Sequence, residues 1–145
     1  MSYTFQTGDV TIPPLSLAAR VCVFLGDLTI LLVFVVVGIH SHGGNAFQMP
    51  AYTLDTLTPF LLTWLIIAPL LGLYARRTLT SYRWSIALVP IAWILVSLFG
   101  AQIRATDYFY GGAPLEFIAV NIVFGILFLV PWRIFVVWLS RIRTE

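Results

Sequence analysis

The chain has 145 residues, of which 60% are apolar, 15% are aromatic and only 10% are charged, and its formal net charge is +2. A soluble domain carries about a quarter charged residues, and a disordered chain is poorer in aromatic side chains, so the composition excludes both classes. The positive charge is small and dispersed, whereas a nucleic-acid partner requires a basic patch or stripe, so we expect no nucleic-acid binding.

The charged side chains are clumped along the chain and leave four long uncharged runs. A transmembrane helix needs roughly 20 mostly apolar residues, so each run can hold one span. We therefore predict an all-α integral membrane protein, a four-transmembrane-helix bundle that forms one domain over residues 1–145. The expected helices cover about residues 17–40, 56–75, 82–103 and 114–139.

The first expected helix follows a pair of prolines, and Ser16 can cap its first turn. It ends before Gly43 and Gly44, because paired glycines favour a turn over continued helix. No basic residue precedes Arg20, and the apolar run is longer than that of a secretion signal. We expect this segment to be a retained span.

Prolines and arginines mark the limits of the later helices. Thr58 and Pro59 are the expected cap and first residue of the second helix, although its apolar character begins near Leu54. This helix is expected to end before Arg76. The fourth helix is expected to begin at Pro114, again a favourable first position for proline.

Three further prolines, Pro69, Pro90 and Pro131, fall inside expected helices. Each frees the carbonyl four residues earlier and can kink its helix, and membrane proteins tolerate this where a neighbouring group satisfies the carbonyl. Such kinks can frame a cavity, but prolines are also common in membrane helices without any such role.

Small residues recur at four-residue spacing on all four expected helices, as in Ala18, Cys22 and Gly26 on the first and Asn121 and Gly125 on the fourth. Such ridges let helix backbones approach closely, which is the main packing device within a bilayer. They predict a tight bundle. The spacing leaves open whether a ridge faces the same chain or a second copy.

The arginines indicate how the chain crosses the membrane. Six of them fall in segments that a four-span topology places on one side, whereas Arg104 alone falls on the other. Because basic residues are retained on the cytoplasmic side, both termini are expected in the cytoplasm and the loops around His42 and Asp107 outside. We expect a multi-pass protein of the plasma membrane. The six are Arg20, Arg76, Arg77, Arg83, Arg141 and Arg143.

Asp27 is the charged residue that topology does not explain, because it lies well inside the first expected helix. A carboxylate there costs about 2.5 to 3.5 kcal/mol on insertion scales, so it should face the bundle and have a partner or be protonated. Arg133, at a similar depth on the fourth helix, is the candidate partner, unless its side chain extends to the lipid headgroups. Asp27 is then either a structural link between helices or a proton or cation site.

The expected outer surface contains two further groups of polar residues. Arg104, Asp107 and Glu116 converge where the third and fourth helices meet, either as an ion pair that closes a loop or as an anion or headgroup site. Ser41 and His42 lie in the first turn, where the spacing does not favour metal binding, so we interpret them as interfacial turn residues.

Asn121 is expected to be buried in the fourth helix, where an amide can bridge two helices for roughly 0.6 to 2 kcal/mol. Trp64 and Trp93 are deep enough to pack within the bundle. Other aromatic residues, among them Tyr74 and Trp132, are expected in the belt at the inner membrane surface.

The run from Asp27 to the turn Gly38-Ile-His-Ser41-His42-Gly43, and the segment from Ala113-Pro114 through Trp132-Arg133, resemble a family of small four-helix prokaryotic membrane proteins, domain-of-unknown-function family 3054. The resemblance covers about residues 20–139 and is weak across the second and third helices. This chain has Ile39 and His40 where the family often has basic residues. The resemblance implies the four-span fold and emphasises Asp27, Ser41, His42 and Arg133, but it implies no activity, cofactor or partner.

The sequence favours a non-enzymatic membrane protein or accessory subunit, with the lipid bilayer and either a second copy or a larger membrane protein as partners. The alternative is a small oligomeric transporter or channel that uses Asp27 as a proton or cation site. A membrane enzyme that uses His42 with Asp107 or Glu116 is a third hypothesis. No residue is assigned a catalytic role, and we expect no metal and no cofactor, since Cys22 stands alone.

Overall fold

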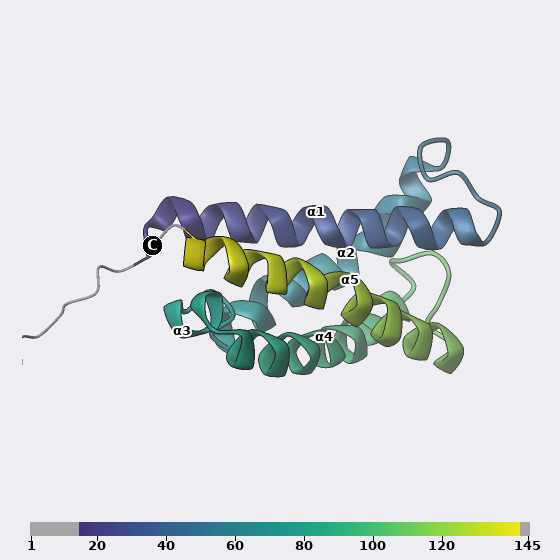
Figure 1. The fold of residues 1–145 in the computed structure, drawn as a ribbon. Helices are drawn as coiled ribbons and strands as arrows, with labels where there is room; N and C mark the ends of the chain where they lie inside the picture. Colours follow the sequence, from purple (N-terminus) through teal and green to yellow (C-terminus); the bar gives the residue numbers. More distant parts are fainter. Residues whose placement is uncertain (1–14, 143–145) are drawn as a thin grey trace, which may run out of the picture.

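The computed structural model describes residues 15–142, and over this range the chain forms five helices and no strand, which confirms the all-α prediction (Figure 1). Four of the helices are long and apolar enough to cross a membrane. These four are α1 (Leu17–Ser41), α2 (Pro50–Leu70), α4 (Tyr82–Arg104) and α5 (Leu115–Ile142), and a short α3 (Arg76–Thr80) lies between α2 and α4.

The four long helices pack in the cyclic order α1, α2, α4, α5, and α3 packs against α4 and α5. The C-terminal end of α5 lies beside the start of α1, and the two helices diverge toward their other ends (Figure 1). We call the end of the bundle that carries α3 the Arg76 end. The opposite end, which carries the links at residues 42–49 and 105–114, is the His42 end.

The expected limits of the second helix are wrong by about one and a half turns. The helix begins at Pro50, where a proline fits because the first helical N–H has no intrahelical acceptor. It ends at Leu70 because Gly72 has a positive φ of 71°. The N–H groups of Leu73 and Gly72 then donate to the carbonyls of Ala68 and Pro69, which is the glycine-terminated cap common at helix ends.

Because α2 begins early, Pro59 lies inside the helix and not at its start. A proline at this position leaves the carbonyl of Asp55 without its usual intrahelical donor. Arg104 supplies a replacement, because its Nη1 donates to that carbonyl over 3.2 Å. The other helical prolines, Pro69, Pro90 and Pro131, lie inside helices as expected.

The core is built on Trp64 of α2 and Trp93 of α4, which are both fully buried as predicted. Their ring centroids are 6.1 Å apart. A Cβ atom added at Gly125 would overlap the Trp93 ring, and one added at Gly26 would overlap the Trp132 ring. At these two positions, therefore, the small residue packs against a helix of the same chain.

Candidate functional site

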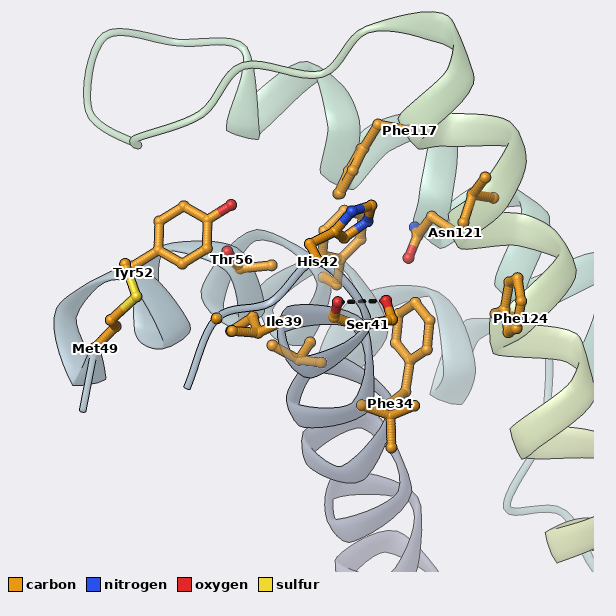
Figure 2. A pocket seen from close by; sticks show the side chains of 16 residues that line it. Phe34, Ile39, Ser41, His42, Met49, Tyr52, Thr56, Phe117, Asn121 and Phe124 are labelled. Carbon is orange, nitrogen blue, oxygen red and sulfur yellow. Dashed lines mark hydrogen bonds between the residues drawn. The ribbon is translucent and has the colours of Figure 1, made fainter. Parts of the chain in front are cut away.

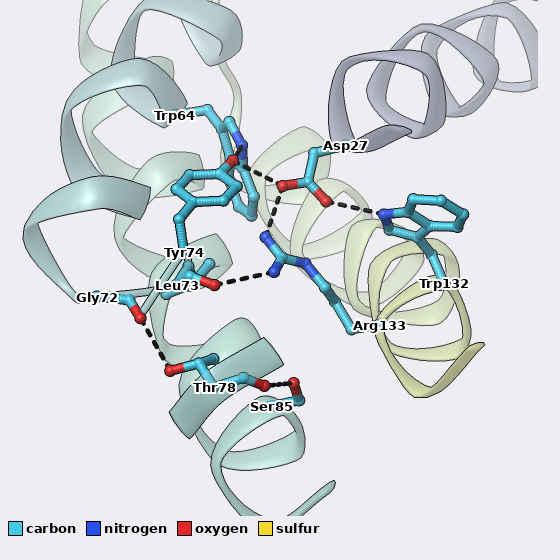
Figure 3. A network of polar contacts seen from close by, with 9 residues as sticks. All are labelled: Asp27, Trp64, Gly72, Leu73, Tyr74, Thr78, Ser85, Trp132 and Arg133. Atoms are coloured by element: carbon cyan, nitrogen blue, oxygen red, sulfur yellow. Dashed lines mark hydrogen bonds and ion pairs between the residues drawn. The ribbon is translucent and has the colours of Figure 1, made fainter. Parts of the chain in front are cut away.

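Asp27 is fully buried on α1, and its carboxylate accepts hydrogen bonds from three side chains (Figure 3). Arg133 Nη2 donates to Oδ2 over 2.5 Å and Tyr74 Oη donates to the same oxygen over 2.6 Å. Trp132 Nε1 donates to Oδ1 over 2.9 Å. The expected pair of Asp27 and Arg133 is therefore formed, and it joins α1 to α5.

Arg133 is as buried as its partner, with an exposed fraction of 1%, so its side chain does not extend out of the bundle as the headgroup alternative required. Its Nη1 donates to the carbonyl of Leu73 over 3.0 Å, which ties α5 to the link after α2. The opposite charges of Arg133 and Asp27 cancel, and these additional hydrogen bonds offset part of the cost of burying the pair. Arg133 Nε has no hydrogen-bond partner among the described residues.

Sequence reasoning missed Tyr74 and Trp132, which it had placed in the aromatic belt at the inner membrane surface. Both rings instead present a polar atom to Asp27, and Trp64 Nε1 donates to Tyr74 Oη over 3.0 Å. Burial, and then the neighbouring Asp27 carboxylate, raise the pKa of Tyr74 above its usual value, so its hydroxyl remains a donor. The sequence offered one indication of the contact between Trp132 and Asp27, which is that Trp132 directly precedes Arg133, the expected partner of Asp27.

A cavity of about 570 Å³ lies at the His42 end, lined by α1, the start of α2 and the first turns of α5 (Figure 2). Most of its wall is aliphatic or aromatic, and none of its lining residues is Asp, Glu, Lys or Arg. Sequence reasoning did not locate this cavity, because it depends on the angle between α1 and α5. Six of its lining residues are Phe34, Gly38, Tyr52, Thr56, Phe117 and Asn121.

Two side chains in the cavity wall contain buried polar atoms that have no hydrogen-bond partner among the described residues, Thr56 Oγ1 and Asn121 Oδ1. The Asn121 side chain is 2% exposed, and its Nδ2 donates to Ser97 Oγ over 3.1 Å. The backbone carbonyl of Asn121 accepts from Trp93 Nε1 over 2.9 Å. Asn121 thus links α5 to α4 as expected, while its Oδ1 points toward the interior of the cavity (Figure 2).

His42 and Ser41 are exposed and also line the cavity. Ser41 Oγ donates to the carbonyl of Gly38 over 2.7 Å, which is a local contact at the helix end. Neither Asp107 nor Glu116 contributes to this wall. His42 therefore shares no cavity wall with either of the carboxylates that the enzyme hypothesis pairs with it.

Arg104 is 2% exposed, whereas Asp107 and Glu116 are exposed, and the expected ion pair among them is not formed. Within residues 15–142 the only ion pair is that of Asp27 and Arg133. Arg104 instead donates to two backbone carbonyls, through Nη1 to Asp55 and through Nε to Gly112 over 2.9 Å. The predicted ion pair was wrong because it matched Arg104 only with charged side chains. Pro59 in α2 leaves the backbone carbonyl of Asp55 free, and Arg104 donates to that carbonyl instead.

Arg104 and Asp107 also line a second, shallow hollow of about 370 Å³ in the link between α4 and α5. In the part of the chain that the structure describes, no group of three or more His, Cys, Asp or Glu side chains is placed to hold a metal ion.

A family model described as "protein of unknown function (DUF3054)" matches residues 24–136 of the chain. No curated protein matches the chain, and no solved structure matches it.

Proposed function

We propose that this chain, which belongs to the DUF3054 family, is a non-enzymatic multi-pass membrane protein that acts as an accessory protein by binding an apolar molecule from the surrounding bilayer. The family description supplies no activity. The proposal therefore rests on the cavity at the His42 end and on the network around Asp27.

The cavity is the observation that supports binding. Its volume of about 570 Å³ lies within the range of small-molecule sites, and its wall is largely apolar with a few polar atoms, as in such sites generally. It lies between α1 and α5, two of the four helices that are long enough to cross a membrane. Access from the bilayer would therefore run between these two helices.

The proposed setting is the plasma membrane, with both termini in the cytoplasm and the His42 end outside. The Arg76 end supports this orientation, because exposed Arg77 lies 4.3 Å from the Trp84 ring centroid and Arg141 lies 4.5 Å from that of Tyr82. Trp and Tyr are enriched at both membrane interfaces, and Lys and Arg are enriched on the cytoplasmic side. At the His42 end, Arg104 is buried in backbone contacts.

The transporter hypothesis, in which Asp27 is a proton or cation site, has less support. The Asp27 carboxylate already accepts three hydrogen bonds and forms an ion pair, and it does not line the cavity. A carboxylate so engaged joins helices, and its release would leave Arg133 buried without a counter-charge. If Asp27 does carry protons, vesicles containing the Asp27→Asn variant should lose proton or cation flux that the wild type supports.

The test of binding is purification of the intact protein in a mild detergent, followed by native mass spectrometry of the small molecules that remain bound. The wild type should retain an apolar molecule, and the Gly38→Leu variant should retain at least tenfold less. Gly38 lines the cavity, and a Cβ atom added there meets no other atom within 4 Å, so leucine can occupy open space without displacing the backbone.

The matched control is Val33→Leu, because Val33 is an exposed residue of the same helix that does not line the cavity. This control should retain the molecule at the wild-type level. Equal retention by all three proteins, or retention by none, would contradict the proposed function.

A further inference from the structure

We infer that the cavity at the His42 end takes an uncharged, single-chain lipid whose head carries a hydroxyl group, that is, a long-chain or isoprenoid alcohol. The inference rests on the proposed function, because it names the class of molecule that the cavity binds. Three properties of the wall lead to it: its charge, its unpaired polar atoms, and its position.

The buried part of the wall offers no charge to a charged head group, because the histidine of the lining, His42, is exposed. No Asp, Glu, Lys or Arg side chain lines the cavity, and the two buried arginines of the described chain, Arg104 and Arg133, are occupied by backbone carbonyls and by Asp27. A phosphate or carboxylate taken into this wall would lose its hydration and find no cation in exchange. Burial of such an unpaired charge is strongly unfavourable.

The unpaired polar atoms define what the head group must offer. Asn121 Oδ1 can only accept a hydrogen bond, so the ligand must carry a donor. Thr56 Oγ1 can donate or accept. A hydroxyl group suits either atom, because it donates one hydrogen bond and accepts others, whereas an ester, an ether or a quinone only accepts.

The position of these two atoms separates the head from the chain. Thr56 on α2 lies beside Tyr52, and Asn121 on α5 lies one turn after Phe117, while Phe34 and Phe124 lie farther along α1 and α5 toward the middle of the bundle (Figure 2). The cavity volume of about 570 Å³ falls in the range of sites for one small ligand and is modest for a lipid with two acyl chains. The structure therefore assigns the polar part to the alcohol and the apolar part to its chain.

The experiment compares two probes on the full chain reconstituted in nanodiscs. The first is hexadecanol with a photoactivatable diazirine in its chain, and the second is the methyl ether of the same molecule, which retains the oxygen but lacks the donor. Photolabelling is measured as a function of probe concentration, and labelled peptides are mapped by mass spectrometry. The alcohol should saturate at a concentration about tenfold lower than the ether, with label on the cavity peptides.

Two variants separate the roles of the unpaired atoms. Asn121→Leu removes the acceptor, so the binding of the alcohol should weaken about tenfold and become no tighter than that of the ether. The binding of the ether should be unchanged. Thr56→Val is nearly isosteric and removes a hydroxyl that has no partner, so it should not lower the thermal stability of the empty protein. Thr56→Val should weaken the binding of both probes several-fold, because the oxygen of the alcohol and that of the ether can each accept a hydrogen bond from Thr56.

Since Asn121→Leu also removes the hydrogen bond to Ser97 and can impair folding, Thr56→Val is the variant that keeps the test valid. Equal saturation by alcohol and ether in the wild type would overturn the assignment to alcohols while leaving the proposed binding function intact. If neither probe saturates, both the assignment to alcohols and the proposed binding function are overturned. The same holds if the Gly38→Leu variant and the Val33→Leu variant are both labelled as strongly as the wild type.

Discussion

At the scale of single residues, the main feature is a carboxylate whose partners come from three separate parts of the chain. Asp27 lies on α1, Tyr74 in the link after α2, and Trp132 and Arg133 on α5. Each partner offsets part of the cost of burying the Asp27 carboxylate. When one partner is removed, the remaining partners no longer offset the full cost. The residues therefore act as a unit, and substitutions within the unit should not be additive.

The first prediction concerns this unit. Asp27→Asn and Arg133→Gln should each lower the free energy of unfolding by about 3 to 5 kcal/mol, because each leaves one buried charge unpaired. The double variant should lose clearly less than the sum of the two, with a coupling of about 1 to 3 kcal/mol. Reversible unfolding in mixed micelles measures all four corners of the cycle.

The control for this cycle is Asp55→Asn, since Asp55 forms no ion pair in the described structure. It should change the free energy of unfolding by less than about 0.5 kcal/mol. Additive losses for Asp27→Asn and Arg133→Gln would mean that the two charges do not stabilise one another.

At the scale of helices, a break in one element is repaired by a side chain of another. Pro59 interrupts the hydrogen-bond ladder of α2, and Arg104, the last residue of α4, donates to the carbonyl that is left free. The same arginine closes the link before α5 through Gly112. A buried cation is thus held by carbonyl dipoles and by the Phe117 ring, whose centroid is 5.0 Å away.

The second prediction follows from this repair. Arg104→Met should lower the free energy of unfolding by about 1 to 3 kcal/mol, because it removes the donor from two part-buried hydrogen bonds to backbone carbonyls. In a Pro59→Ala background the loss should be smaller, since the N–H of residue 59 can then bond the carbonyl of Asp55. Arg83→Met, at an exposed arginine of the same helix, is the matched control and should have little effect. Equal losses for Arg104→Met in both backgrounds would show that the repair contributes nothing.

The third prediction concerns the close approach of helices. Gly26→Ala and Gly125→Ala should each cost about 1 to 3 kcal/mol, because the added methyl group would overlap the ring of Trp132 or Trp93. Gly38→Ala meets open space and should stabilise α1 by up to about 1 kcal/mol through helix propensity. Thermal unfolding of the three variants under one set of detergent conditions provides the comparison. A loss of stability for Gly38→Ala equal to the other two would contradict this account.

At the scale of the whole molecule, the proposed topology places the Arg76 end in the cytoplasm and the His42 end outside. The fourth prediction uses single cysteines in a Cys22→Ala background. A membrane-impermeant maleimide should label Gln48→Cys in intact cells, whereas Ala75→Cys should react only after the membrane is permeabilised. Immediate labelling of both would indicate mixed orientation, and the reverse pattern would place the termini outside.

The sequence predicted the number and nature of the long helices, because apolar runs and clumped charges are properties of the chain itself. It also anticipated the pairing of Asp27 with Arg133, since a buried carboxylate needs a counter-charge and Arg133 lay at a similar depth. The limits of α2 could not be found in this way. They depend on the backbone of Gly72 and on whether an arginine from another helix supports Pro59.

The amino-acid sequence by itself determined that the chain is all-α, that four helices are apolar enough to span a membrane, and that Asp27 requires a partner, because these follow from composition and local spacing. Only the tertiary structure decided that Tyr74 and Trp132 turn toward Asp27, that Arg104 binds carbonyls, and that α1 and α5 diverge to leave a cavity. Helix crossing angles set these contacts, and they arise from the packing of side chains such as Trp93 over Gly125 that lie far apart in the chain.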